Sequence, residues 1–282
     1  GAKNWSSGYM PAVYQATTMR PTGDPILHLG RFGKLSKAQQ RHMLDTLKQY
    51  NSQHLSDHVD NSDLAARISS YELAFRMQSE LPRVLSLSQE TAETQTAYGI
   101  DAQGTDNFGR QCLLARRLAE NGVRYIQLFD WGWDFHGTGA ATGLGSGLRN
   151  KCKTMDKPVA ALIRDLKQRG LLDETLIVWG GEFGRTPFRE GRTAKSKVLG
   201  RDHYPDVYTQ WMAGGGVKGG IVHGSSDEHG IAVAEDRVHV HDFHATILHQ
   251  MGLDDMELTF YHAGRFKRLT DLGGQIITEA LA

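Results

Sequence analysis

The sequence is short of the residues that mark several specialised classes of protein. It has two cysteines, Cys112 and Cys152, among 282 residues, too few for a disulfide framework or a cysteine zinc ribbon. We interpret both as structural thiols. The 32 basic and 32 acidic residues cancel, so bulk charge does not support nucleic-acid or anionic-membrane binding. No apolar run approaches the roughly 20 residues of a membrane helix.

Histidine, in contrast, is plentiful and unevenly placed. Nine of the 13 histidines lie from His136 onward, so the C-terminal half carries most of the potential metal ligands. Three of them, His239, His241 and His244, lie around Asp242, where a helix is expected to start. We interpret these three as structural or capping groups rather than as a metal cluster.

The order of apolar patterns predicts an α/β fold. Residues 1–35 show no period and are expected to be an irregular lead-in, followed by one helix from Ser36 and another from about Asn61 that breaks before Pro82. Then "NFGRQCLLARRLAENG" and "KPVAALIRDLKQRG" read as helices stopped by glycine, each followed by an apolar run, "VRYIQLFD" and "ETLIVWG". Apolar strands alternating with helices favour a parallel sheet covered on both faces.

The remaining segments extend this pattern to the C-terminus. "VYTQWMAGGG" and "GGIVHG" are expected to be strands, and "VHVHDFHATILHQMGL" a helix from near Asp242 to Gly252. The tail predicts a short strand and a last helix. We therefore expect one domain over residues 1–282, with a helical lead-in over 1–105 and a mostly parallel central sheet, with helices on both faces, over 106–282.

Polar clusters follow the predicted strands, where ligands of open parallel sheets gather. Asp130, Asp134 and His136 follow "VRYIQLF". In extended backbone Asp134 and His136 point to the same side, so one cation can bind both. The alternative is an ordinary polar loop, since Asp-x-His by itself is a weak signal.

Two further clusters follow the same logic. Glu182 and Arg185 come after "TLIVW" among glycines that let the backbone approach a ligand, and Arg185 is suited to holding a tetrahedral oxyanion. The alternative here is a structural Glu–Arg pair. Asp202 and His203 lie in "GRDHYPD", for which a surface turn is the alternative. Their shared position after successive strands predicts a single site.

Long stretches of the chain resemble a bacterial family. "LLDETLIVWGGEFGRTP", "GRDHYPDVYTQWMAGGGVKGG" and "VHVHDFHATILHQMGLD" are similar to the C-terminal signature of domain of unknown function 1501, a sulfatase-like family of the alkaline phosphatase superfamily. The resemblance implies an alkaline-phosphatase-like fold, and export to the periplasm or beyond. It also implies metal ligands at Asp134, His136 and His203, and fold roles for Asp242 and Thr246.

Two departures from the superfamily pattern change what the resemblance implies. Where superfamily members have Asp-His-Gly at the end of a strand, this chain has Glu182-Phe183-Gly184. Because Phe183 cannot bind a metal, one ion is expected rather than two. No Asp-Gly-Gly segment, the superfamily's first metal-binding and nucleophile region, precedes Asp130. We therefore expect the chain to be the later part of a longer protein or a shortened variant.

The sequence thus supports two hypotheses of function. The first is a hydrolase of small-molecule or glycan sulfate or phosphate esters that depends on a divalent ion such as zinc, calcium or manganese. In this hypothesis Glu182 and Arg185 are catalytic. The expected metal ligands are Asp134, His136, His203, Glu182 and Asp202, followed by Asp130 as the weakest candidate. The alternative is a non-catalytic member of the same fold that binds a glycan, an anion or a protein partner.

Overall fold

The computed structural model describes residues 5–7, 10–31, 33, 35–58 and 61–282. The expected irregular lead-in therefore lies partly outside the described residues. The chain forms two compact units, each described here by itself. The first comprises residues 1–89 and 262–264, and the second comprises residues 90–261 and 265–282. The single-domain organisation over residues 1–282 stays a prediction.

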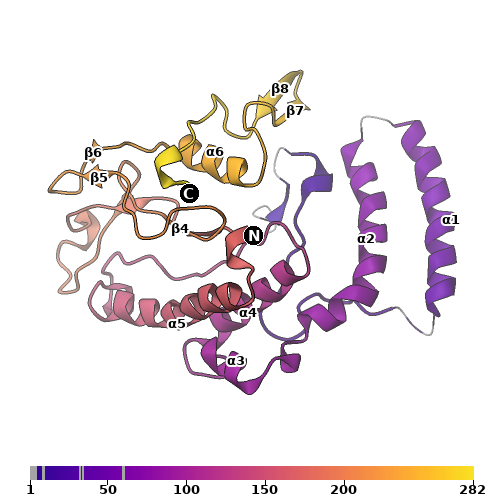
Figure 1. Ribbon diagram of the computed structural model, residues 1–282, viewed down its shortest axis with the longest axis horizontal. Coiled ribbons are helices and arrows are strands. Elements are labelled where there is room, and N and C mark those ends of the chain that lie inside the picture. Colours follow the sequence, from indigo (N-terminus) through magenta and orange to yellow (C-terminus); the bar gives the residue numbers. More distant parts are fainter. Residues whose placement is uncertain (1–4, 8–9, 32, 34, 59–60) are drawn as a thin grey trace. The chain divides into compact units, whose positions relative to one another are not determined.

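Helices dominate the regular structure (Figure 1). The α-helices are α1 (Lys37–Ser56), α2 (Ser62–Leu85), α3 (Ala92–Ala97), α4 (Asp106–Glu120), α5 (Ser146–Gln168) and α6 (Val240–Gln250). The strands are β1 (Ile177–Trp179), β2 (Gly184–Arg185), β3 (His203–Tyr204), β4 (Trp211–Ala213), β5 (Ser225–Ser226), β6 (Val233–Glu235), β7 (Thr259–His262) and β8 (Arg265–Arg268).

The first unit contains the helical hairpin of α1 and α2, which lie side by side (Figure 1). A capping box starts α1, because the Ser36 hydroxyl accepts from the Gln39 N–H and the Gln39 side chain accepts from the Ser36 N–H. The predicted starts of α1 and α2 are confirmed, whereas the helix predicted from Lys157 starts earlier, at Ser146 of α5. The predicted end before Pro82 is wrong, since α2 runs through Pro82 to Leu85. Pro82 has no N–H to donate within the helix, so one helical hydrogen bond is lost there, while Leu85 beyond it is buried at 8% exposure.

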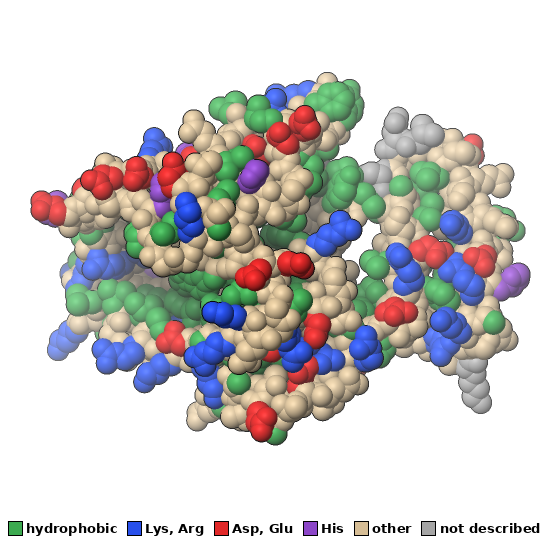
Figure 2. Space-filling model, in the orientation of Figure 1, with side chains coloured by type: hydrophobic (Ala, Val, Ile, Leu, Met, Phe, Trp, Pro, Cys, Tyr) green, Lys and Arg blue, Asp and Glu red, His purple; other side chains and the backbone are tan. Residues whose placement is uncertain are grey.

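The second unit has its core between α4 and α5 (Figure 1). Leu113 and Leu166 are almost completely buried there, at 0% and 1% exposure. The predicted stop of α4 is confirmed, with Gly122 just beyond it at φ +81°. Figure 2 shows Lys and Arg side chains gathered along α5, whose apolar positions face inward. Neither α5 nor any other described helix combines the length and the apolar character of a membrane crossing.

A buried arginine joins the elements of this core. The Arg116 side chain on α4 is 1% exposed. Its guanidinium nitrogens lie 2.6 Å from Glu90 Oε2, 2.7 Å from Glu120 Oε2 and 2.9 Å from Asp165 Oδ2. Asp165 also accepts a hydrogen bond of 3.0 Å from the Tyr98 hydroxyl. One buried cation thus holds carboxylates from α4, α5 and the segment before α3.

The prediction of a parallel central sheet is wrong. Of the described residues, 43% are helical and 9% are in strands or bridges, and the sheets are two-stranded. The predicted strand "ETLIVWG" shrinks to β1, which pairs antiparallel with β4 so that Trp179 lies opposite Trp211. The segment 123–130 and the segment 219–224 contain no strand. The tail strand is confirmed as β8, but the last helix is only a 3-10 turn, Thr278–Ala280.

Side-chain exposure gives the physical reason for this correction. The apolar runs were interpreted as strands buried on both faces. In the structure Tyr125 is 67% exposed and Val178 is 40% exposed, so these runs are not covered on both sides. Extended backbone without a strand beside it cannot form the hydrogen bonds of a sheet. Apolar composition alone therefore did not specify strand pairing.

Of the histidines around α6, expected as structural or capping groups, His239 is the cap and His244 makes a local hydrogen-bond contact. His239 is the N-cap, and its Nδ1 accepts from the His241 N–H at 3.2 Å. Asp242 Oδ2 accepts in return from the His239 N–H at 2.7 Å. His244 Nδ1 lies 2.8 Å from the Val240 carbonyl. Among the residues that the structure describes, these three histidines belong to no group able to hold a metal.

We predict that Arg116→Met lowers the free energy of unfolding by about 3–5 kcal/mol, because it leaves buried carboxylates without their cation. The matched control is Arg110→Met, also on α4, whose pairs with Asp101 and Asp106 are partly exposed. We expect it to cost about 0–1 kcal/mol. Urea denaturation measures both. Equal losses in the two variants would contradict the importance of Arg116.

A pH dependence follows from Glu90. Burial raises its pKa, but the hydrogen bonds and the charge attraction of Arg116 and Arg117 together outweigh burial and leave the pKa below its ordinary value. The folded state therefore binds this proton less tightly than the unfolded state. Wild type should be more stable than Glu90→Gln at about pH 6, and this advantage should shrink as the pH falls towards about 3. Urea denaturation across this range is the test, and a constant difference would refute it.

Candidate metal centre

Two stretches of irregular chain build the candidate site. They are the site segment, residues 133–137, and the site loop, residues 186–202, which connects β2 to β3. The Arg201 N–H donates to the Phe135 carbonyl at 2.9 Å. The Ser196 hydroxyl donates to the Gly137 carbonyl at 2.8 Å. Hydrogen bonds to the backbone, rather than a sheet, therefore hold the two stretches together.

Two glycines allow this close approach. A Cβ atom on Gly200 would lie 1.9 Å from the His136 carbonyl carbon and 2.1 Å from the Gly137 nitrogen, far inside van der Waals contact. Gly137 has φ +80°, a conformation that favours glycine, and a Cβ there would lie 2.7 Å from the Gly200 nitrogen. The backbone on either side of His136 is thus fixed by the site loop.

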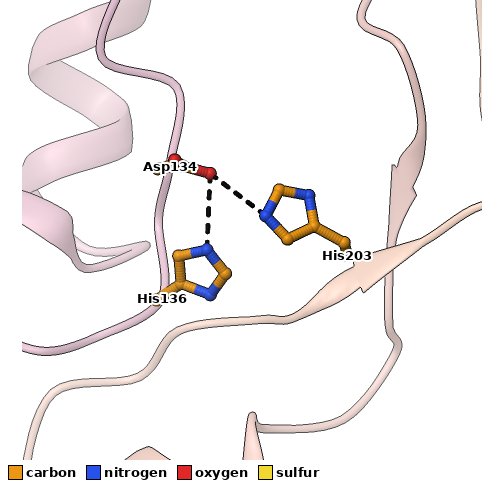
Figure 3. Close-up of side chains that lie close together, drawn as sticks. All are labelled: Asp134, His136 and His203. Atoms are coloured by element: carbon orange, nitrogen blue, oxygen red, sulfur yellow. Dashed lines mark ion pairs between the residues drawn. The ribbon is translucent and has the colours of Figure 1, made fainter.

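Asp134, His136 and His203 converge at this place (Figure 3). Asp134 Oδ1 lies 3.3 Å from His136 Nε2 and 3.4 Å from His203 Nε2. His136 is largely buried, with 12% of its side chain exposed, whereas 38% of His203 and 69% of Asp134 are exposed. Asp134 and His136 come from the site segment and His203 comes from β3. Residues far apart in sequence thus form one group.

The spacing of these atoms suits a metal ion. Zinc binds imidazole nitrogen and carboxylate oxygen at about 2.0–2.2 Å. Two such ligands at a tetrahedral angle are about 3.4 Å apart, and Asp134 Oδ1 lies 3.3 Å and 3.4 Å from the two imidazole nitrogens. Three protein ligands also leave a fourth position open, as in catalytic zinc sites. The residues present therefore fit a divalent ion.

Arg185, from β2, reaches the same group. Its Nη2 donates to Asp134 Oδ1 at 2.8 Å and to the Trp133 carbonyl at 3.1 Å, and its Nη1 lies 3.5 Å from His136 Nε2. The hydrogen bond from Arg185 is the largest effect on Asp134 and holds its pKa below the ordinary value, although burial opposes it. Asp134 is thus kept ionised, the form that binds metal.

A second group shares His136 and contains a residue that the sequence did not suggest. His136, Glu190 and Asp202 also offer ligand atoms close enough for one ion. Glu190 is 6% exposed, and its Oε2 lies 3.0 Å from His136 Nδ1. In the sequence Glu190 stands in the basic run "REGRTAKSKVLGR", and no local signal distinguishes it.

Other predicted site residues lie apart from these groups. Asp130 Oδ1 lies 2.5 Å from Lys151 Nζ, and its Oδ2 accepts from Trp133 Nε1 at 3.0 Å, so its carboxylate is already engaged. Glu182 is exposed, and no described residue forms an ion pair with it. Its neighbour Phe183 packs edge-on against His203, with ring centroids 5.5 Å apart.

Comparison with known families assigns this chain to one family. The family described as "Protein of unknown function (DUF1501)" matches residues 1–281, and the chain therefore belongs to that family. No curated protein matches the chain. No solved structure matches it either. Membership by itself assigns no activity, so a function has to be argued from the site.

We predict that Gly200→Ala lowers the free energy of unfolding by about 1–3 kcal/mol, because its Cβ would force the site loop away from His136. The matched control is Gly191→Ala in the same loop, where a Cβ meets nothing within 4 Å. We expect that variant to stay within about 0.5 kcal/mol of wild type. Urea denaturation compares them, and an unchanged Gly200→Ala would contradict the close contact.

Proposed function

Since membership of this family states no activity, we propose that the protein binds one divalent metal ion through Asp134, His136 and His203 and hydrolyses sulfate or phosphate esters there. The observation that carries the proposal is the convergence of one carboxylate and two imidazoles at ligand spacing, with a guanidinium beside them. The expected substrates are small-molecule or glycan esters.

The donor set favours zinc or manganese over calcium. Two of the three ligands are imidazoles, which suit zinc and similar transition metals. Calcium takes six to eight oxygen ligands, and this group supplies a single carboxylate. Because Phe183 occupies the place of a superfamily histidine and Glu182 lies outside both groups, the proposal is for one ion rather than two.

Each residue has a distinct part in this proposal. A bound divalent ion would polarise the oxygens of an ester and stabilise charge that develops on them. Arg185 presents a planar guanidinium suited to two oxygens of a sulfate or phosphate group. Its hydrogen bond to Asp134 holds that cation at the metal group. Glu182, exposed and without an ion-pair partner among the described residues, stays a candidate base on the neighbouring loop.

The proposed relation to sulfatases rests on sequence motifs and not on a sheet. The supporting motifs are Glu182-Phe183-Gly184, the Asp134 and His136 pair, and the loop that carries His203. These are the positions at which the superfamily places metal ligands after its strands. Export to the periplasm or beyond, which the same resemblance implies, likewise stays a proposal.

A non-catalytic role is the second candidate, and one contact favours it. Arg185 already neutralises Asp134 through a hydrogen bond of 2.8 Å. An Arg–Asp pair with two histidines beside it forms a charge-balanced group without any metal. In that case the site would bind an anion, a glycan or a protein partner through Arg185 and the histidines.

Metal analysis tests the proposed binding. Wild type dialysed against zinc should retain one ion per chain by mass spectrometry, and Asp134→Ala and His203→Ala should each lose it, because two ligands do not hold a divalent ion tightly. His229→Ala is the control, since 70% of its side chain is exposed and it belongs to neither group. Equal zinc retention in all four proteins would overturn the assignment.

Turnover separates the two candidate functions. Aryl sulfate and aryl phosphate are offered to wild type with added zinc, manganese or calcium. Hydrolysis that falls by about 10²–10³ in kcat/KM in Arg185→Ala supports the hydrolase, as expected for removal of a donor to developing charge. Zinc binding without any turnover of either ester would favour the non-catalytic candidate.

A further inference from the structure

We propose that Glu190 is a positioning residue, which holds the proton of neutral His136 on Nδ1 and so leaves Nε2 as the metal-ligating nitrogen. The consequence for metal affinity rests on the proposed function, whereas the position of the proton does not. Metal-binding histidines generally donate their second nitrogen to a carboxylate or carbonyl, which fixes the ring and its tautomer. Glu190 is placed to accept in this way.

The first support is the distance and burial of the pair. Glu190 Oε2 and His136 Nδ1 lie 3.0 Å apart, and their side chains are 7% and 12% exposed. Neither atom has another hydrogen-bond partner in the described part of the chain, and their present angle is not that of a hydrogen bond. A buried carboxylate oxygen without a donor is costly. A hydrogen bond from Nδ1–H to Oε2 would satisfy both atoms at once.

The second support comes from the opposite nitrogen. Arg185 Nη1 lies 3.5 Å from His136 Nε2. A guanidinium only donates, so this contact is a hydrogen bond only when Nε2 is the unprotonated acceptor. Asp134 Oδ1, at 3.3 Å from the same nitrogen, already accepts from Arg185 at 2.8 Å. Arg185 on one side and Glu190 on the other therefore select the same tautomer, with the proton on Nδ1.

The fold holds Glu190 in place for this role. The Glu190 carbonyl accepts from the N–H of Thr193 at 3.1 Å and from its hydroxyl at 3.0 Å, which closes a 3-10 turn, Gly191–Thr193. Arg192 Nε pairs with Glu190 Oε1, which leaves Oε2 for His136. Arg189 Nη1 donates to the Ala194 and Ser196 carbonyls and folds the loop around this turn.

This role also accounts for the second group of potential ligands. His136 is common to both groups, and it presents Nε2 to Asp134 and Nδ1 to Glu190. If Nδ1 carries a proton, it cannot bind an ion. The group of His136, Glu190 and Asp202 then forms the polar support behind a single metal group, which agrees with one ion per chain.

The tautomer is measured in metal-free protein with ¹⁵N-labelled histidine. Two-bond ¹⁵N–¹H correlation spectra at about pH 8.5, where histidine is ordinarily neutral, report which ring nitrogen is protonated. His136→Gln assigns the signal. We expect the Nδ1–H form in wild type, its retention in Glu190→Gln, whose amide oxygen still accepts, and its loss in Glu190→Ala. Glu228→Gln, which removes an exposed carboxylate paired with His229, should leave the His136 signal unchanged.

Zinc titration by competition with a chelator gives the second readout. Glu190→Ala should weaken zinc binding by about 10–100-fold, and Glu190→Gln by less. Circular dichroism and urea denaturation show that the variants are folded. Wild-type His136 in the Nε2–H form, or the same tautomer in Glu190→Ala, would overturn the proposal. So would two zinc ions in wild type and one in Glu190→Ala, because Glu190 would then be a ligand.

The two proposals fail in different ways. Wild type that binds no zinc but has His136 as the Nδ1–H form refutes the proposed metal function and supports the role of Glu190. Wild type that binds zinc while Glu190→Ala changes neither tautomer nor affinity refutes the role of Glu190 alone.

Discussion

The contact of Gly200 with the backbone of His136 and Gly137 is the constraint on which the candidate site depends. It brings a loop from beyond β2 against a segment about sixty residues earlier, at a distance that no larger residue permits. From one side of this contact come Asp134 and His136, and from the other come the site loop and β3. Without it these side chains would have no reason to share a site.

Hydrogen bonds and ion pairs between irregular segments replace a central sheet in the second unit. Arg116 neutralises carboxylates around the α4 and α5 core, and the Ser196 hydroxyl and the Arg201 N–H of the site loop satisfy backbone carbonyls beside His136. Such links are directional, so each fixes a local geometry that apolar contact alone leaves loose. Rigid surroundings are what a site with few ligands needs, because a shift of about 1 Å spoils its geometry.

Much of the regular structure could be predicted from the sequence, because its signals are local. The Ser36 cap and the glycine after α4 depend on neighbours a few residues away, and both predictions hold. Asp134, His136 and His203 were expected to share a site, and the structure brings them together. The expected route, through the ends of parallel strands, was wrong. Glu190 was missed because its partner, His136, lies 54 residues earlier in the chain.

The sequence by itself determined where α1, α2 and α4 start, where α4 and α5 stop, and which residue types are available to bind a cation. Caps, glycine stops and the polarity of side chains act over one or two turns of chain. Only the tertiary structure decided that apolar runs stay outside a parallel sheet, that Arg185 pairs with Asp134, and that Glu190 faces His136. These outcomes depend on which distant segments approach each other. Backbone hydrogen bonds and close glycine contacts decide that approach, and neither leaves a local pattern in the sequence.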